Sequence, residues 1–207
     1  ESTKTEVLMQ KAQIVGRDLR MAQSAKQVEK LLVQLQEVGR EADAGFSALG
    51  ILTVAADQRE RFNDIKALST KYIVALSDIG AKRAAILSLF TKLDEAETKW
   101  ARSVNLVINS EQFAFLPNMN TVDALIKEAE SAFKDARTAA WRYFVLSESS
   151  QVLRIAGAAD QATQKLLFAR RDVANDTVAR GIDGLGAIVP EYIAILKSIT
   201  DTIDLQN

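Results

Sequence analysis

The longest regular pattern in the chain runs from residue 62 to residue 107, where apolar side chains recur at intervals of three and four. The apolar positions are Phe62, Ile65, Tyr72, Leu76, Ile79, Ile86, Phe90, Leu93, Trp100, Val104 and Val107. This spacing, uninterrupted by proline, predicts one heptad-like helix over about 55–112, with Ser69, Arg83 and Glu97 as polar residues on its seam. At about 1.5 Å per residue the stripe spans roughly 70 Å, about twice the length of an ordinary bundle helix. We therefore expect this helix to run through two stacked helical layers.

Shorter helical patterns fill the rest of the chain. They predict helices over about 3–24, 26–48, 121–147, 149–178 and from 181 onward. Residues 109–120, which include Pro117, end the long helix, and Thr121 is the expected N-cap of the next one. The glycine-rich stretch 181–186 is expected to open the last helix, with Pro190 in its first turn or at a kink.

The second half of the chain echoes the first. Residues 16–23 resemble 134–141, residues 27–28 match 151–152, and residues 65–79 resemble 185–199, in the same order. Three ordered matches indicate a duplication. We therefore predict a single all-α domain of six helices, built as two repeats, 1–116 and 117–207. It would form an elongated bundle of two stacked four-helix modules that share two long helices. In this register the second long helix should continue about two dozen residues further, so that the second repeat is truncated.

Composition narrows the function. The chain contains no cysteine and no histidine, which removes the usual nucleophile pairs and metal ligands, so we expect no enzyme, no cofactor and no metal site. A net charge of −1 provides no basic surface for nucleic acid. The sequence has no run of about 18 apolar residues and no signal-peptide pattern. It is therefore either a soluble protein or the soluble piece of a membrane protein.

Three segments, 17–23, 70–104 and 135–148, carry a resemblance to the helical bimodular sensor domain of bacterial chemoreceptors and some sensor kinases. The resemblance implies a periplasmic domain of an inner-membrane protein that works as a homodimer. Flanking transmembrane helices, absent from this chain, would anchor it. The resemblance also implies a small organic acid as ligand, held by two arginines one turn apart on the first helix. In this sequence Arg20 occupies the first of those positions and Gln23 the second.

Several arginines and aromatic residues are candidates for the ligand site. Arg20 and Arg137 occupy matching positions in the two repeats, so we expect them to converge on one carboxylate, which arginine can hold bidentately. Other candidates are Arg17, Arg83, Arg142, Tyr143 and Trp141. The alternative for the arginines is a solvated surface, with some of them paired to Asp18 or Asp135. For Arg83 another alternative is a polar joint between the layers, and Glu97 is expected to be a structural or dimer-contact residue.

The four aromatic residues Tyr72, Trp100, Trp141 and Tyr192 are expected to pack in the core, with Trp141 the best alternative candidate for a pocket wall. Together these features predict a non-enzymatic sensor that binds a small carboxylate and signals by helix displacement. Two alternatives are a helical scaffold or interaction protein that binds partner helices or lipid, and a sensor that reads a periplasmic binding protein.

Overall fold

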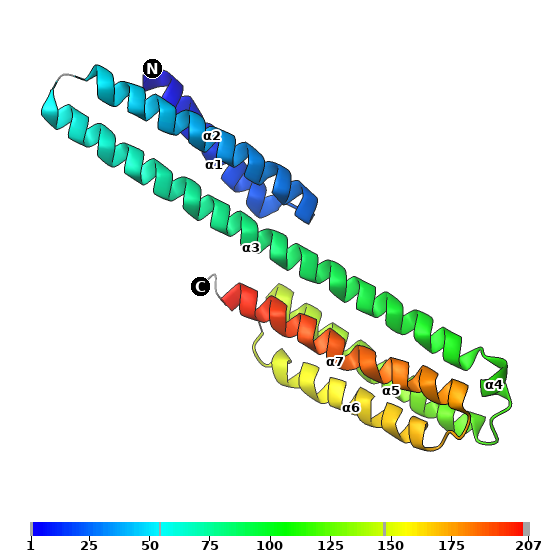
Figure 1. The fold of residues 1–207 in the computed structure, drawn as a ribbon. Coiled ribbons are helices and arrows are strands. Elements are labelled where there is room, and N and C mark those ends of the chain that lie inside the picture. The colour runs from blue at the N-terminus through cyan, green and yellow to red at the C-terminus, as the bar shows by residue number, and fades with distance from the viewer. Residues whose placement is uncertain (1, 54, 147, 205–207) are drawn as a thin grey trace. The chain divides into compact units, whose positions relative to one another are not determined.

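The computed structural model describes residues 2–53, 55–146 and 148–204, which form seven α-helices and no strand (Figure 1). The helices are α1 (Ser2–Met21), α2 (Ala25–Leu52), α3 (Ala56–Ile108), α4 (Glu111–Ala114), α5 (Met119–Leu146), α6 (Gln151–Arg171) and α7 (Asp176–Asp204). The prediction of an all-α chain is therefore confirmed. The predicted number of six is one too low, because α4 forms in the link after the long helix, where the Ser110 side chain accepts a hydrogen bond from the Phe113 amide at 3.2 Å.

The long third helix is confirmed, and so is most of its apolar stripe. Six of the predicted positions are buried: Leu76, Ile86, Leu93, Trp100, Val104 and Val107. Ile65 and Ile79 are wrong as core positions, since 46% and 40% of their surface is exposed.

The chain divides into two compact units, residues 1–88 and residues 89–207. The first unit contains α1, α2 and the part of α3 up to Ser88. Helices α1 and α2 form an antiparallel pair (Figure 1), and the turn between them is fixed by Ser24, whose hydroxyl caps α2 by accepting from the Gln27 amide at 3.2 Å. The largest core cluster of the first unit consists of Ala12, Val15, Leu19, Ala22, Val28, Leu35 and Leu76.

A glycine allows α3 to pack closely in this first unit. A β-carbon at Gly80 would lie 2.6 Å from Leu32 Cδ2 and 3.2 Å from Leu19 Cδ2. Because glycine has no side chain, α3 can approach both α1 and α2 at this level.

The second unit contains the part of α3 from Leu89 together with α4, α5, α6 and α7. Small side chains line the buried face of α5, namely Ala129, Ala132, Ala136, Ala139 and Ala140, and they allow close helix packing. Aromatic rings fill the centre. Trp100 stacks on Phe133 with ring centroids 4.3 Å apart, and Tyr192 meets Phe133 edge-on at 5.0 Å. The core predictions for Trp100 and Tyr192 are confirmed.

The described residues of the first unit supply three helices, and the buried residues of α7 all belong to the core of the second unit. The predicted four-helix module of the first unit stays a prediction. The predicted duplication into repeats 1–116 and 117–207 stays a prediction, since a compact unit and a sequence repeat are different divisions of the chain.

The last helix begins earlier than predicted. The side chain of Asn175 accepts hydrogen bonds from the amides of Thr177 at 3.0 Å and Val178 at 3.2 Å, which caps α7 at Asp176. The glycine-rich stretch 181–186 and Pro190 consequently lie inside α7 rather than at its start. The local cap and the buried face of α7 outweigh the low helix propensity of these residues.

Within the part of the chain that the structure describes, no helix combines the length and the apolar character that a membrane span requires.

Candidate functional site

The arginines predicted on the first helix lie on the surface of the first unit. Arg17 is exposed and pairs with Asp18 at 3.3 Å. This agrees with the alternative to ligand contact, in which the arginine is solvated and paired to Asp18. Arg20 is also exposed, and its Nε donates to the Gly16 carbonyl at 3.2 Å. Gln23 follows the end of α1, where its backbone amide donates to the Gln27 side chain at 3.2 Å. The contact with the Gly16 carbonyl uses only the Nε of the Arg20 guanidinium group.

Arg83 has a structural contact. Its Nε and Nη2 donate to the Ala22 carbonyl at 3.3 and 3.0 Å. Carbonyls that follow the end of a helix lack intrahelical partners, and a half-buried arginine satisfies this one. The interaction links α3 to the α1–α2 turn within the first unit.

Arg137 lies in the second unit and forms an ion pair with Glu97, whose side chain is only 17% exposed. The Tyr192 hydroxyl donates to Glu97 Oε1 at 3.3 Å. Burial raises the pKa of the Tyr192 phenol well above its usual value, and the negative charge of Glu97 raises it further. We call Glu97, Arg137 and Tyr192 the interior polar cluster. It joins α3, α5 and α7, which supports the expected structural role of Glu97.

Two buried donors at this cluster have no partner among the described residues: Arg137 Nε and Trp100 Nε1. Trp100 is one helical turn from Glu97 on α3. Because the guanidinium of Arg137 is already neutralised by Glu97, a ligand acid would have to compete with an internal carboxylate for it.

The candidates at the end of α5 are more exposed than predicted. Trp141 is 64% exposed, so its predicted place in the core is wrong. The buried stripe of α5 ends at Ala140, and the indole projects beyond it. Arg142 is exposed as well, whereas Tyr143 is half-buried with its ring edge-on to Phe144 at 5.5 Å.

Arg20 belongs to the first unit and Arg137 to the second, and each makes its polar contacts within its own unit. Their convergence on one ligand stays a prediction.

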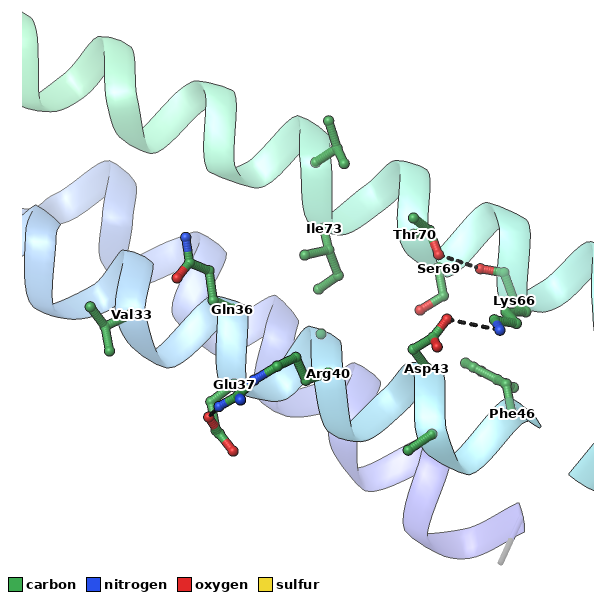
Figure 2. Close-up of a pocket in the computed structure, with 13 residues that line it drawn as sticks. Val33, Gln36, Glu37, Arg40, Asp43, Phe46, Lys66, Ser69, Thr70 and Ile73 are labelled. Carbon is green, nitrogen blue, oxygen red and sulfur yellow. Dashed lines mark hydrogen bonds and ion pairs between the residues drawn. The ribbon is translucent and has the colours of Figure 1, made fainter. Parts of the chain in front are cut away.

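The first unit contains a groove of about 760 Å³ between α2 and α3, shown in Figure 2. We call it the α2–α3 groove. Its volume falls in the range of small-molecule sites, about 300–1,000 Å³. Helix α2 contributes residues between Val33 and Phe46, and α3 contributes residues between Lys66 and Val74.

The most enclosed charge at the groove is Lys66, whose side chain is 35% exposed. Its ammonium pairs with Asp43 Oδ1 at 3.1 Å and donates to Ser47 Oγ at 2.9 Å, so that it connects α3 to α2 (Figure 2). A second ion pair, between Arg40 and Glu37, lies along α2 and is more exposed. The groove therefore contains two cations and two carboxylates.

Apolar side chains form the rest of the surface. Phe46 is buried, Ile73 is half-buried, and Val33 and Val74 are largely exposed. Gly39 faces Ile73, where a β-carbon would come within 3.1 Å of Ile73 Cγ2. Ser69 is buried beneath the groove, and its hydroxyl contacts Met9 Sδ at 3.2 Å.

No sequence pattern identifies Lys66 or Asp43 as a site residue. Lys66 directly follows the stripe residue Ile65, and in a helical sequence a lysine beside a stripe is usually a solvated residue. Only the packing of α2 against α3 shows that it is partly enclosed. Among the described residues, no group of three or more acidic side chains is placed to hold a metal ion.

Comparison of this chain with protein-family models, with curated proteins and with solved structures found no match.

Proposed function

We propose that the chain is a non-enzymatic sensor domain that binds a small organic acid. In this proposal it is the periplasmic part of a bacterial inner-membrane chemoreceptor. It is built by duplication, acts as a homodimer and signals by helix displacement. Exposed apolar residues of α1 spaced seven apart, Val7, Ile14 and Met21, support self-association, because heptad spacing suits helix pairing.

The observation that carries the proposal is Lys66 in the α2–α3 groove. It is a partly enclosed cation beside apolar side chains, in a hollow large enough for a small metabolite. Its partner Asp43 is 52% exposed, and a pair this open is only weakly held. A ligand carboxylate can therefore compete with Asp43 for the ammonium.

The position of the groove suggests how binding would become a signal. A ligand lying between α2 and α3 contacts both helices, so it favours whichever arrangement of the two it binds more tightly. Helix α3 is continuous from Ala56 to Ile108 and supplies core residues to both units. A shift of α3 is therefore the change that we expect to carry the signal.

Isothermal titration calorimetry with a panel of mono-, di- and tricarboxylates and amino acids tests the proposal. At least one of these acids should bind, and Lys66→Met should weaken its binding at least about tenfold, as expected when a charged contact is lost. Lys127→Met is the matched control, because Lys127 forms an exposed pair with Asp123 on α5, outside the groove. Arg20→Ala and Arg137→Ala test the site expected from the sequence.

If no acid in the panel binds, the sensor proposal is wrong. If an acid binds and its affinity falls with Arg20→Ala or Arg137→Ala but not with Lys66→Met, the function stands and the site is the one that the sequence predicts.

A further inference from the structure

The charges that line the α2–α3 groove cancel. Arg40 and Lys66 are cationic and Glu37 and Asp43 are anionic, and these are the only charged residues among the described ones that line it. A ligand that carries only negative charge would be attracted by one cation but repelled by a carboxylate a few ångströms away. A ligand that carries only positive charge would be attracted by a carboxylate but repelled by the nearby cation.

We propose that the groove binds a zwitterion, namely an α-amino acid with a short aliphatic side chain. This inference rests on the proposed function and specifies the ligand class of the same site. The ligand carboxylate binds the Lys66 ammonium, and the ligand ammonium binds the Asp43 carboxylate.

The spacing of the two groups favours an α-amino acid. Lys66 Nζ and Asp43 Oδ1 are 3.1 Å apart. Figure 2 shows that the two residues come from different helices. In an α-amino acid the ammonium and carboxylate are attached to the same carbon, so both can reach such a closely spaced pair. The ligand exchanges one internal ion pair for two charge-assisted contacts, and leaves neither protein group without a partner.

The apolar part of the groove suits an aliphatic side chain. Ile73 and Val74 lie on α3 about two turns from Lys66, and Phe46 lies one turn from Asp43 on α2. Burying a branched hydrocarbon against these side chains adds affinity that a small polar amino acid would lack.

Three probes that share one hydrocarbon body test the inference by isothermal titration calorimetry. L-Leucine carries both charges, 4-methylpentanoate lacks the ammonium, and 3-methylbutylamine lacks the carboxylate. We expect leucine to bind at least about tenfold more tightly than either analogue, because each analogue leaves one charged group of the site unmatched. Lys66→Met and Asp43→Asn should each weaken leucine binding at least about tenfold, and Lys127→Met should leave it unchanged. Circular dichroism melting curves of the variants check that each is folded.

Equal binding of leucine and 4-methylpentanoate would overturn the zwitterion inference and leave the proposed acid sensor intact. The inference is also wrong if leucine does not bind while other acids of the panel do. A lower melting temperature of Lys66→Met and Asp43→Asn, with leucine binding unchanged, would show that the pair only joins α2 to α3. If no acid of the panel binds, the proposed function is contradicted as well.

Discussion

At the scale of single residues, the interior polar cluster explains how a carboxylate can lie on a mainly apolar seam. Glu97 occupies a stripe position of α3, where an unpaired buried charge would be costly. Arg137 neutralises it, and Tyr192 donates a second hydrogen bond. Removal of either partner would leave part of the carboxylate unsatisfied, so the cluster favours one register of α3, α5 and α7.

The raised pKa of Tyr192 predicts a loss of stability in alkaline solution. The phenol titrates near pH 10 when the chain is unfolded and higher when it is folded, because burial and then Glu97 disfavour the phenolate. The stabilisation is therefore complete below about pH 10 and declines above it, by up to about 1.4 kcal/mol per pH unit for this one proton. Urea unfolding of the unmodified protein and of Tyr192→Phe, at pH 8 and pH 11, should show a smaller decline for the variant. Equal declines would contradict the assignment.

The sequence could identify these residues but not their partners. The seam positions of Ser69, Arg83 and Glu97 could be predicted because they follow from helical periodicity. The core positions of Trp100 and Tyr192 could be predicted for the same reason. That Arg83 binds the Ala22 carbonyl and Arg137 binds Glu97 depends on which helices face each other. Lys66 and Asp43 could not be identified, because solvated and groove-lining polar residues look alike in a sequence.

At the scale of helices, α7 shows where local propensity misled the prediction. The cluster of three glycines in 181–186 was expected to open the helix, yet the helix already begins at its cap, Asn175, and continues through the glycines. One of the glycines has a packing role. A β-carbon at Gly181 would lie 2.6 Å from Val107 Cγ2, whereas Gly184 has open space around it. The difference between Gly181 and Gly184 depends on tertiary packing, which local sequence patterns do not predict.

Substitution of these two glycines by alanine should therefore change stability in opposite directions. Gly184→Ala removes a flexible residue from a helix without a clash, and should raise the free energy of unfolding by about 0.5–1 kcal/mol. Gly181→Ala should lower it by about 1 kcal/mol, because Val107 is buried and its branched side chain cannot rotate away easily. Urea denaturation followed by circular dichroism measures both. A similar gain in the two variants would show that α3 and α7 can separate without cost.

At the scale of the whole molecule, the position of the boundary between the two units is the main feature that the repeat pattern did not predict. The sequence matches suggested repeats that meet at 116/117, whereas the compact units meet at 88/89 inside α3. The boundary between repeats is inferred from sequence similarity, whereas the boundary between compact units depends on which side chains pack together. The buried clusters of the first unit and of the second unit share no residue.

Separate cores predict that a cavity in one unit increases local opening mainly in that unit. Leu35→Ala removes a fully buried side chain from the first unit, and Phe133→Ala removes the ring that stacks on Trp100 in the second. Each should cost about 2–5 kcal/mol, since large buried side chains leave cavities. In hydrogen–deuterium exchange followed by mass spectrometry, Leu35→Ala should accelerate exchange in α1, α2 and α3 up to Ser88, and leave α5 and α6 protected. Phe133→Ala should do the reverse. Faster exchange throughout the chain in both variants would show that the continuous helix α3 couples the two cores into one cooperative unit.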